Sequence, residues 1–150
     1  MRTETIFRAL ADPTRLRIMR LLGSMELAVG EVAQVLGQSQ PRVSRHIGIL
    51  CDAGLAERRR EGSWVFLRAC ANTNDAPPLS TAIADLLVKA EASDSQFAEE
   101  CELDRRRLAE IREHRENEAQ AYFSDHAHDW DELRRMHSSD EAVEKALTLA

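Results

Sequence analysis

Hydrophobic positions along the chain first predict two short amphipathic helices joined by a tight connection. In residues 29–36 the apolar side chains fall at i, i+3, i+4 and i+7, so that they share one helical face. In residues 40–52 the side chains of Val43, Ile47 and Leu50 fall within about 60° of one another on a helical wheel. These three form the predicted buried face of the second helix, and the sequence GQSQ supplies the connection before it.

The opposite face of the second helix is small and polar around one long cation. It carries Gln40, Ser44 and Arg45, while Arg42 lies on its flank and Ser39 precedes it. Glutamine can make two hydrogen bonds to adenine, arginine can do the same with guanine, and serine reaches bases or phosphates. Two short helices around a tight turn, the second with such a face, are typical of a helix-turn-helix that binds DNA.

Helices are also predicted before this pair. Asp12 is a favourable N-cap and Pro13 suits the first helical position, so a helix is expected from there to the stop at Gly23. A further short helix is expected over residues 2–10.

A β-hairpin is predicted directly after the second helix. Residues 55–60 and 63–68 can pair as strands around the turn Glu61-Gly62, because apolar side chains alternate along the second strand. A hairpin in this place is the wing of a winged helix-turn-helix.

Basic side chains near these elements are candidates for phosphate or minor-groove contacts. Arg58, Arg59 and Arg60 stand at or near the tip of the hairpin, where the flanking phosphates of a duplex are expected. Arg15, in an earlier helix, is a further candidate for a phosphate. His46 falls nearer the core edge of the wheel, so that packing, a phosphate contact and a base contact all stay open for it.

The second half of the chain has the pattern of long helices without internal breaks. All six glycines lie before residue 63, and helices are predicted over residues 79–92 and 95–124. The longer of the two would measure about 45 Å, far more than a small module can cover. Its intermittent apolar seam, interrupted by Asp104, Arg115 and Glu118, is expected to dock on another helix, most economically the same helix of a second subunit.

The composition is typical of a helical, soluble and highly charged protein of one domain with an appendage. The chain has 150 residues, of which 31% are charged and 5% aromatic. Residues 1–75 hold 11 Lys and Arg against 8 Asp and Glu, whereas residues 76–150 hold 9 against 18, so a basic face is expected in the first half. No stretch has the apolar length of a membrane span or a signal peptide, and the expected location is the cytoplasm.

Neither the cysteines nor the C-terminal histidines have the spacing of a metal site. The three cysteines are widely separated and include no C-x-x-C pair, so they are predicted to be ordinary reduced side chains. Two histidines stand two positions apart in DHAHD, which points them about 200° apart on a helix. No bound metal is therefore expected, and the roles of six residues stay open: Cys51, Cys70, Cys101, His126, His128 and His137.

Three motifs within about residues 5–70 occur together: the helix start DPTR, the helix SQPRVSRH, and the entry AGL to a hairpin that carries REG. In this combination the chain resembles the ArsR/SmtB family of bacterial winged-helix repressors. The resemblance implies a homodimer, packed through its first and last helices, that binds an inverted repeat and leaves it when an inducer binds. Carried over by position, the family's DNA-reading residues fall on Gln40, Ser44 and Arg45, which the helical wheel selects independently.

The sensing sites of that family carry over poorly. The paired cysteines of the arsenic sensors would fall on Ala28 and Gly30, so that site is absent. The ligand set of the zinc sensors finds no full match, because Asp104-Arg105-Arg106 lacks the histidine.

The C-terminal stretch AYFSDHAHDWDELRRMHSSDEAVEKAL resembles a connector in ArsR-type regulators that continue into an S-adenosylmethionine-dependent methyltransferase-like domain. Such a nucleotide-binding domain needs glycines at its first strand-to-helix turn, and none follows Gly62. By analogy, S-adenosylhomocysteine or S-adenosylmethionine is the implied effector of the longer relatives, and the pocket for it is not expected within these 150 residues.

Together these observations predict a mainly α protein with a small β-hairpin wing and long C-terminal helices that form a dimer. The expected organisation is a winged helix-turn-helix at residues 1–75, a helical dimerisation region at 76–124, and connector helices at 125–150 to an absent C-terminal domain. The predicted function is a homodimeric, non-enzymatic repressor that binds double-stranded DNA without a cofactor and is released by a small-molecule effector. Two alternatives stay open: the DNA-localising N-terminal fragment of a methyltransferase, and a sensor that responds through thiols or a metal.

Overall fold

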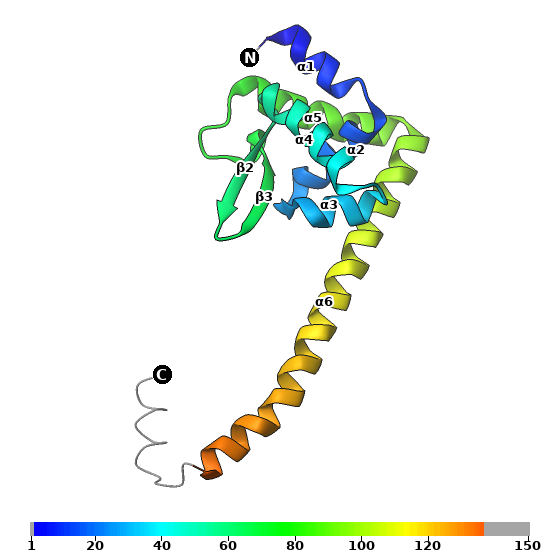
Figure 1. The fold of residues 1–150 in the computed structure, drawn as a ribbon. Helices are drawn as coiled ribbons and strands as arrows, with labels where there is room; N and C mark the ends of the chain where they lie inside the picture. The colour runs from blue at the N-terminus through cyan, green and yellow to red at the C-terminus, as the bar shows by residue number, and fades with distance from the viewer. Residues whose placement is uncertain (1, 137–150) are drawn as a thin grey trace. The chain divides into compact units, whose positions relative to one another are not determined.

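The computed structural model describes the backbone of residues 2–136 and the side chains of residues 2–120. The elements follow one another as α1 (Thr3–Leu10), α2 (Pro13–Ser24), β1 (Leu27–Ala28), α3 (Val29–Leu36), α4 (Gln40–Asp52), β2 (Ala56–Glu61), β3 (Trp64–Ala69), the short 3-10 helix η1 (Cys70–Asn72), α5 (Pro78–Ser93) and α6 (Ser95–Met136). Figure 1 shows how α2, α3 and α4 gather beside the strands β2 and β3. The first compact unit of the chain, which we call the body, ends at Ile111.

Local signals in the sequence set the ends of the helices in the body. Asp12 caps α2, because its carboxylate accepts the backbone N–H of Arg15 at 3.1 Å, and Pro13 takes the first helical position. Gly37 ends α3 with a φ of 64°, a left-handed conformation that glycine adopts at low cost. The four helices predicted before Ala53 are therefore confirmed, with ends that agree closely with the structure.

The predicted hairpin is confirmed one residue later along the chain and forms the wing, which we define as β2, β3 and the turn at Gly62. The two strands are antiparallel, with Arg58 opposite Leu67 and Arg59 opposite Phe66. β1 completes a sheet of strand order β1-β3-β2 and pairs Ala28 with Phe66. The sequence did not predict β1, because a strand of two residues leaves no alternation to detect.

One hydrophobic core joins the helices of the body to the inner side of the sheet. Val43, Ile47 and Leu50, the predicted buried face of α4, are at most 1% exposed. Other fully buried side chains come from the elements around them, namely Ile6, Ile18, Leu22, Leu27, Val32, Val35, Leu55 and Leu67. Because α4 packs through one face only, its opposite face is left to solvent.

The first turns of α6 pack against this same core. Leu108 is buried within it, and Arg107 donates a hydrogen bond of 3.2 Å to the backbone carbonyl of Val35 in α3. Asp104 is 1% exposed and is paired with Arg17 of α2. The expectation that the seam docks on the same helix of a second subunit is therefore wrong for this part of α6, because α2 and α3 of the same chain already cover it.

α6 is also longer than predicted. It does not end at Ser124 but continues to Met136, since no glycine or proline follows Pro78 to stop it. The side chains of His126 and His128, and all of His137, lie outside the described residues. The domain boundaries expected after residues 75 and 124 stay predictions.

Candidate nucleic-acid interface

α4 presents the polar face that the helical wheel predicts. Gln40, Arg42, Ser44 and Arg45 are exposed, and Ser39 stands exposed just before the helix. We call the first four the reading face. Since Val43 and Ile47 of the same helix are buried, the core holds α4 in the one rotation that points these side chains outward.

The two arginines of the reading face are held by no carboxylate. Neither Arg42 nor Arg45 forms an ion pair with any residue among 2–120, and together with Pro41 and His46 they line a shallow hollow on the surface. Two unneutralised guanidinium groups beside a hollow give the face a local positive potential. Such a surface attracts the phosphates of a nucleic acid.

Arg15 and His46 fasten the start of α4 to α2. Nη1 of Arg15 lies 3.2 Å from Nδ1 of His46, and the Asp12 carboxylate lies 3.9 Å from the same nitrogen. Arg15 also donates to the backbone carbonyl of Ala9 at the end of α1. Burial lowers the pKa of His46, and the nearby arginines lower it further against the opposing pull of Asp12. The lowered pKa favours the uncharged ring at neutral pH, and the contacts with Arg15 and Asp12 hold it beside the hollow that Arg42 and Arg45 line.

Arg58 and Arg60 share the face of the wing that carries buried Leu67. Directly opposite residues of an antiparallel pair point to the same side of the sheet, and Arg58 is opposite Leu67 while Arg60 is opposite Val65. The guanidinium of Arg58 reaches α4: a Cβ placed on Gly48 would stand 3.8 Å from its Nη2. Both arginines are thus on the side of the wing that faces α4.

Arg59 lies on the other face of the wing and is occupied there. Its Nε donates to Glu26 at 2.7 Å and its Nη1 to Glu61 at 2.9 Å. The guanidinium also lies 5.1 Å from the ring centre of Phe66, which stacks with Trp64. The basic run of three arginines is therefore divided between two faces, which the sequence prediction did not separate.

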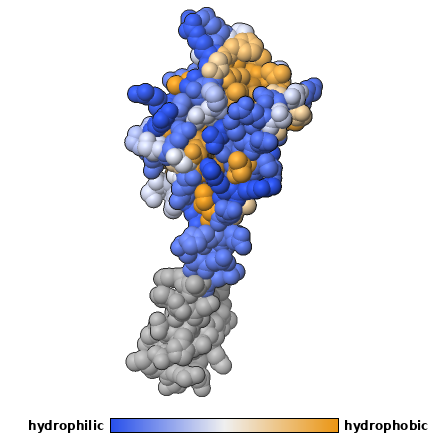
Figure 2. Space-filling view, turned by 90° about the vertical axis from the view of Figure 1, so that its right-hand side faces the viewer, coloured by the Kyte–Doolittle hydropathy of each residue, from blue (hydrophilic) through white to orange (hydrophobic). Residues whose placement is uncertain are grey.

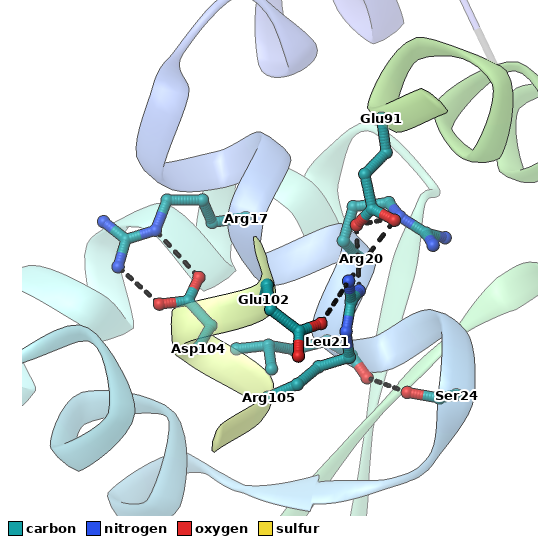
Figure 3. A network of polar contacts seen from close by, with 8 residues as sticks. All are labelled: Arg17, Arg20, Leu21, Ser24, Glu91, Glu102, Asp104 and Arg105. Carbon is teal, nitrogen blue, oxygen red and sulfur yellow. Dashed lines mark hydrogen bonds and ion pairs between the residues drawn. The ribbon is translucent and has the colours of Figure 1, made fainter. Parts of the chain in front are cut away.

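A buried ion pair connects α6 to α2 in the body. Arg17 donates from Nε and Nη2 to the two oxygens of Asp104 at 2.8 and 2.6 Å, a bidentate arrangement that Figure 3 shows. The hydrogen bonds to Asp104 raise the pKa of Arg17, against the lowering effect of burial. Asp104 was expected only as a break in an apolar seam, because its partner Arg17 lies 87 residues away in the chain.

A second cluster connects α6 to α5. Glu91 accepts from Nη1 of Arg105 at 2.8 Å and lies 3.5 Å from Nε of Arg20, and Figure 3 shows both arginines converging on it. Hydrogen bonding by Arg105, Cys101 and Arg20 lowers the pKa of Glu91 to about 2. We call this cluster and the Arg17–Asp104 pair the α6 junction.

The three cysteines of the body are free thiols that lie partly or fully buried. Burial raises the pKa of Cys51 and Cys70, and burial with the Glu91 carboxylate raises that of Cys101 to about 12. Because the thiolate is the reactive form, these shifts disfavour oxidation and metal ligation near neutral pH.

The described residues form neither a metal-binding cluster nor a membrane-spanning helix. No group of three or more His, Cys, Asp and Glu side chains is arranged there to hold a metal ion. Among the same residues, no helix combines the length and the apolar character that crossing a lipid bilayer requires.

Comparison with known proteins finds one family over the elements just described. The family model described as "Bacterial regulatory protein, arsR family" matches residues 12–58, which run from the cap of α2 into the wing. The arsenical resistance operon repressor of Escherichia coli strain K12 is 45% identical over 64 residues, which cover 42% of this chain and 55% of that protein. The HTH-type transcriptional regulator MJ1325 of Methanocaldococcus jannaschii is 45% identical over 64 residues, which cover 41% of this chain and 70% of that one.

A solved structure with a similar fold is the homodimeric winged helix-turn-helix DNA-binding domain Mb0332 of Mycobacterium bovis, a fragment of residues 1–100. It superposes with a TM-score of 0.51 at 29% identity, over 62% of this chain and 80% of that fragment. The fold of the body is accordingly that of a winged helix-turn-helix. The chain spans about half the length of several curated relatives that it matches.

Proposed function

Because the chain belongs to the ArsR family of bacterial regulatory proteins, we propose that it is a cytoplasmic, homodimeric repressor that binds an inverted-repeat operator. The observation that carries the proposal is the reading face. α4 buries Val43 and Ile47 and exposes Gln40, Ser44 and Arg45, which are the residue types that recognise base edges in a major groove.

In this proposal one set of side chains contacts bases and a second set contacts phosphates. Gln40, Ser44 and Arg45 read bases, since they project from the first two turns of α4. Arg42, Arg58 and Arg60 neutralise phosphates, because they are exposed and no carboxylate among residues 2–120 engages them. Ser39 lies at the N-terminal end of α4 and adds a hydroxyl that can reach the same DNA phosphates.

Exposed apolar side chains on two helices support the homodimer. Phe7 of α1 is 58% exposed, and Leu79 and Leu86 of α5 are 42% and 52% exposed. Figure 2 shows an apolar area on the upper part of the body, above a mainly hydrophilic surface with smaller apolar spots. A second copy of the chain, packed through α1 and α5, would remove such side chains from water.

Selection of bound duplexes from a randomised pool at physiological salt tests the proposal, with the oligomeric state measured in parallel. The expected result is a dimer that enriches an inverted repeat with half-sites about one helical turn apart. If no sequence is enriched, or if a monomer enriches a single half-site, the proposal of a dimer that recognises an inverted repeat is contradicted.

Release by an effector is the remaining part of the proposal. By analogy with longer relatives, S-adenosylhomocysteine and S-adenosylmethionine are the first compounds to titrate into the preformed complex. A dose-dependent fall in DNA affinity supports release by this class of compound, and an unchanged affinity removes this class from the proposal.

A further inference from the structure

Arg59 reaches across the whole sheet on the face turned away from α4. In the register of the strands, Ala28 of β1, Phe66 of β3 and Arg59 of β2 stand in one row. The guanidinium lies over Phe66 of the middle strand and ends on Glu26, which precedes β1. One side chain thus connects the outermost strand of the wing to the chain segment at the opposite edge of the sheet.

Two carboxylates hold the guanidinium of Arg59 through hydrogen bonds. Glu26 accepts from both Nε and Nη2, at 2.7 and 3.2 Å, and Glu61 accepts from Nη1. The hydrogen bonds from Arg59 lower the pKa of Glu26, and both carboxylates raise the pKa of Arg59. Three of its five N–H groups are thus engaged by carboxylates, so a phosphate would meet a guanidinium whose charge is already balanced.

We propose that Arg59 and Glu26 are positioning residues that hold the wing at a fixed angle to the body, and that Arg59 does not contact DNA. The function of the pair is to keep Arg58 and Arg60 beside α4, so that both sets of contacts reach one duplex together. Only the predicted effect on DNA binding rests on the proposed function. The holding of the wing is a property of the free protein.

Glu26→Gln gives the sharpest test, because the two roles of Arg59 predict opposite signs. If Arg59 contacts phosphate, removal of a competing carboxylate makes binding to the duplex enriched by the wild-type protein tighter. If the pair holds the wing, the same change weakens binding by roughly two- to fivefold. Weaker binding is the expected result, and tighter binding overturns the inference.

Arg59→Gln and the double variant complete a thermodynamic cycle. The expected double variant binds no more weakly than either single variant, because each change breaks the same contact. A fall of about 0.9 in the salt slope for Arg59→Gln, in the presence or absence of Glu26→Gln, identifies a direct phosphate contact and overturns the inference.

Glu57→Gln is the matched control for the lost carboxylate. Glu57 pairs with Arg68 at 2.9 Å within the hairpin and lies on the same face as Arg59, but it makes no connection from the wing to Glu26. This change is expected to leave DNA affinity unchanged or slightly increased. If Glu57→Gln lost as much DNA affinity as Glu26→Gln, the cause would be the overall charge of this face of the wing, and the inference would be overturned.

Trp64 supplies a measurement that needs no DNA. It stacks on Phe66 at 6.5 Å, next to the guanidinium of Arg59, and Trp130→Phe leaves it as the single tryptophan of the chain. Glu26→Gln in that background is expected to increase acrylamide quenching of Trp64, whereas Glu57→Gln is not. If the wild-type protein binds no duplex, the proposed function fails, but the quenching measurement still tests whether the pair holds the wing. Unchanged quenching in Glu26→Gln overturns the inference.

Discussion

The reading face and the α6 junction are both rich in arginine, yet their arginines are in opposite states. Arg42 and Arg45 of α4 are exposed and have no carboxylate partner among residues 2–120. Arg17 and Arg105 at the junction each meet a carboxylate within 2.8 Å. The role of an arginine in this protein therefore depends on whether a neighbouring element supplies a carboxylate, which no count of basic residues along the sequence reveals.

Loss of the buried carboxylate at the junction is expected to have the largest effect. Asp104→Ala leaves Arg17 with an unpaired charge that is 19% exposed, and we expect a loss of about 3–5 kcal/mol in the free energy of unfolding. Denaturant unfolding measures it. The double variant Arg17→Met with Asp104→Leu should recover most of the loss, and a double variant as unstable as the single one would contradict the assignment of the cost to the stranded charge.

The Glu91 cluster is expected to give a smaller effect that depends on pH. The pKa of Glu91 is lowered from 4.5 to about 2, so its stabilisation is present above pH 4.5 and is lost as the pH falls towards 2. Glu91→Gln should cost roughly 1–3 kcal/mol at pH 6, and this difference from the wild type should shrink below pH 4.5. Unfolding titrations of both proteins across this range measure it; a difference that stays constant would mean that the carboxylate charge is not responsible.

On the reading face, Arg45→Ala should leave stability unchanged and reduce sequence preference. The expected loss is about 1–3 kcal/mol on the enriched duplex, with little change on random DNA. Competition binding against random DNA gives both numbers. Equal losses on the two duplexes would show that Arg45 anchors phosphates and does not read a base.

Arg60→Ala should give the smallest and least selective effect. It is expected to weaken binding to all duplexes alike and to reduce the slope of log K against log salt by about 0.9, because one phosphate contact is lost. Salt titrations of wild type and variant measure the slope. An unchanged slope would place Arg60, like Arg59, away from the DNA.

The fold of the body was largely predictable because its signals are local. The cap at Asp12, the stop at Gly37 and the period of Val43, Ile47 and Leu50 each lie within a few residues of the helix that they define. The same periodicity that buries one face of α4 also selects the reading face, so the fold and the candidate site were predicted by one argument.

The contacts of the charged side chains were not predictable in this way. Asp104 and Arg17 are 87 residues apart, and Arg59 and Glu26 are 33 apart, so only the folded chain brings them together. The division of the wing arginines was nevertheless within reach of the sequence. Successive residues of a strand point to opposite faces, which already separates Arg59 from Arg58 and Arg60.

The sheet has two edges, and neither invites another strand. β1 offers only two residues, and β2, with the sequence AERRRE, carries charge at five of its six positions. A strand with that much charge is a poor template for the backbone of a second molecule, since pairing would bury or juxtapose like charges. The charges of β2 thus also disfavour aggregation through the wing, and in the proposed dimer they leave helical surfaces as the route of association.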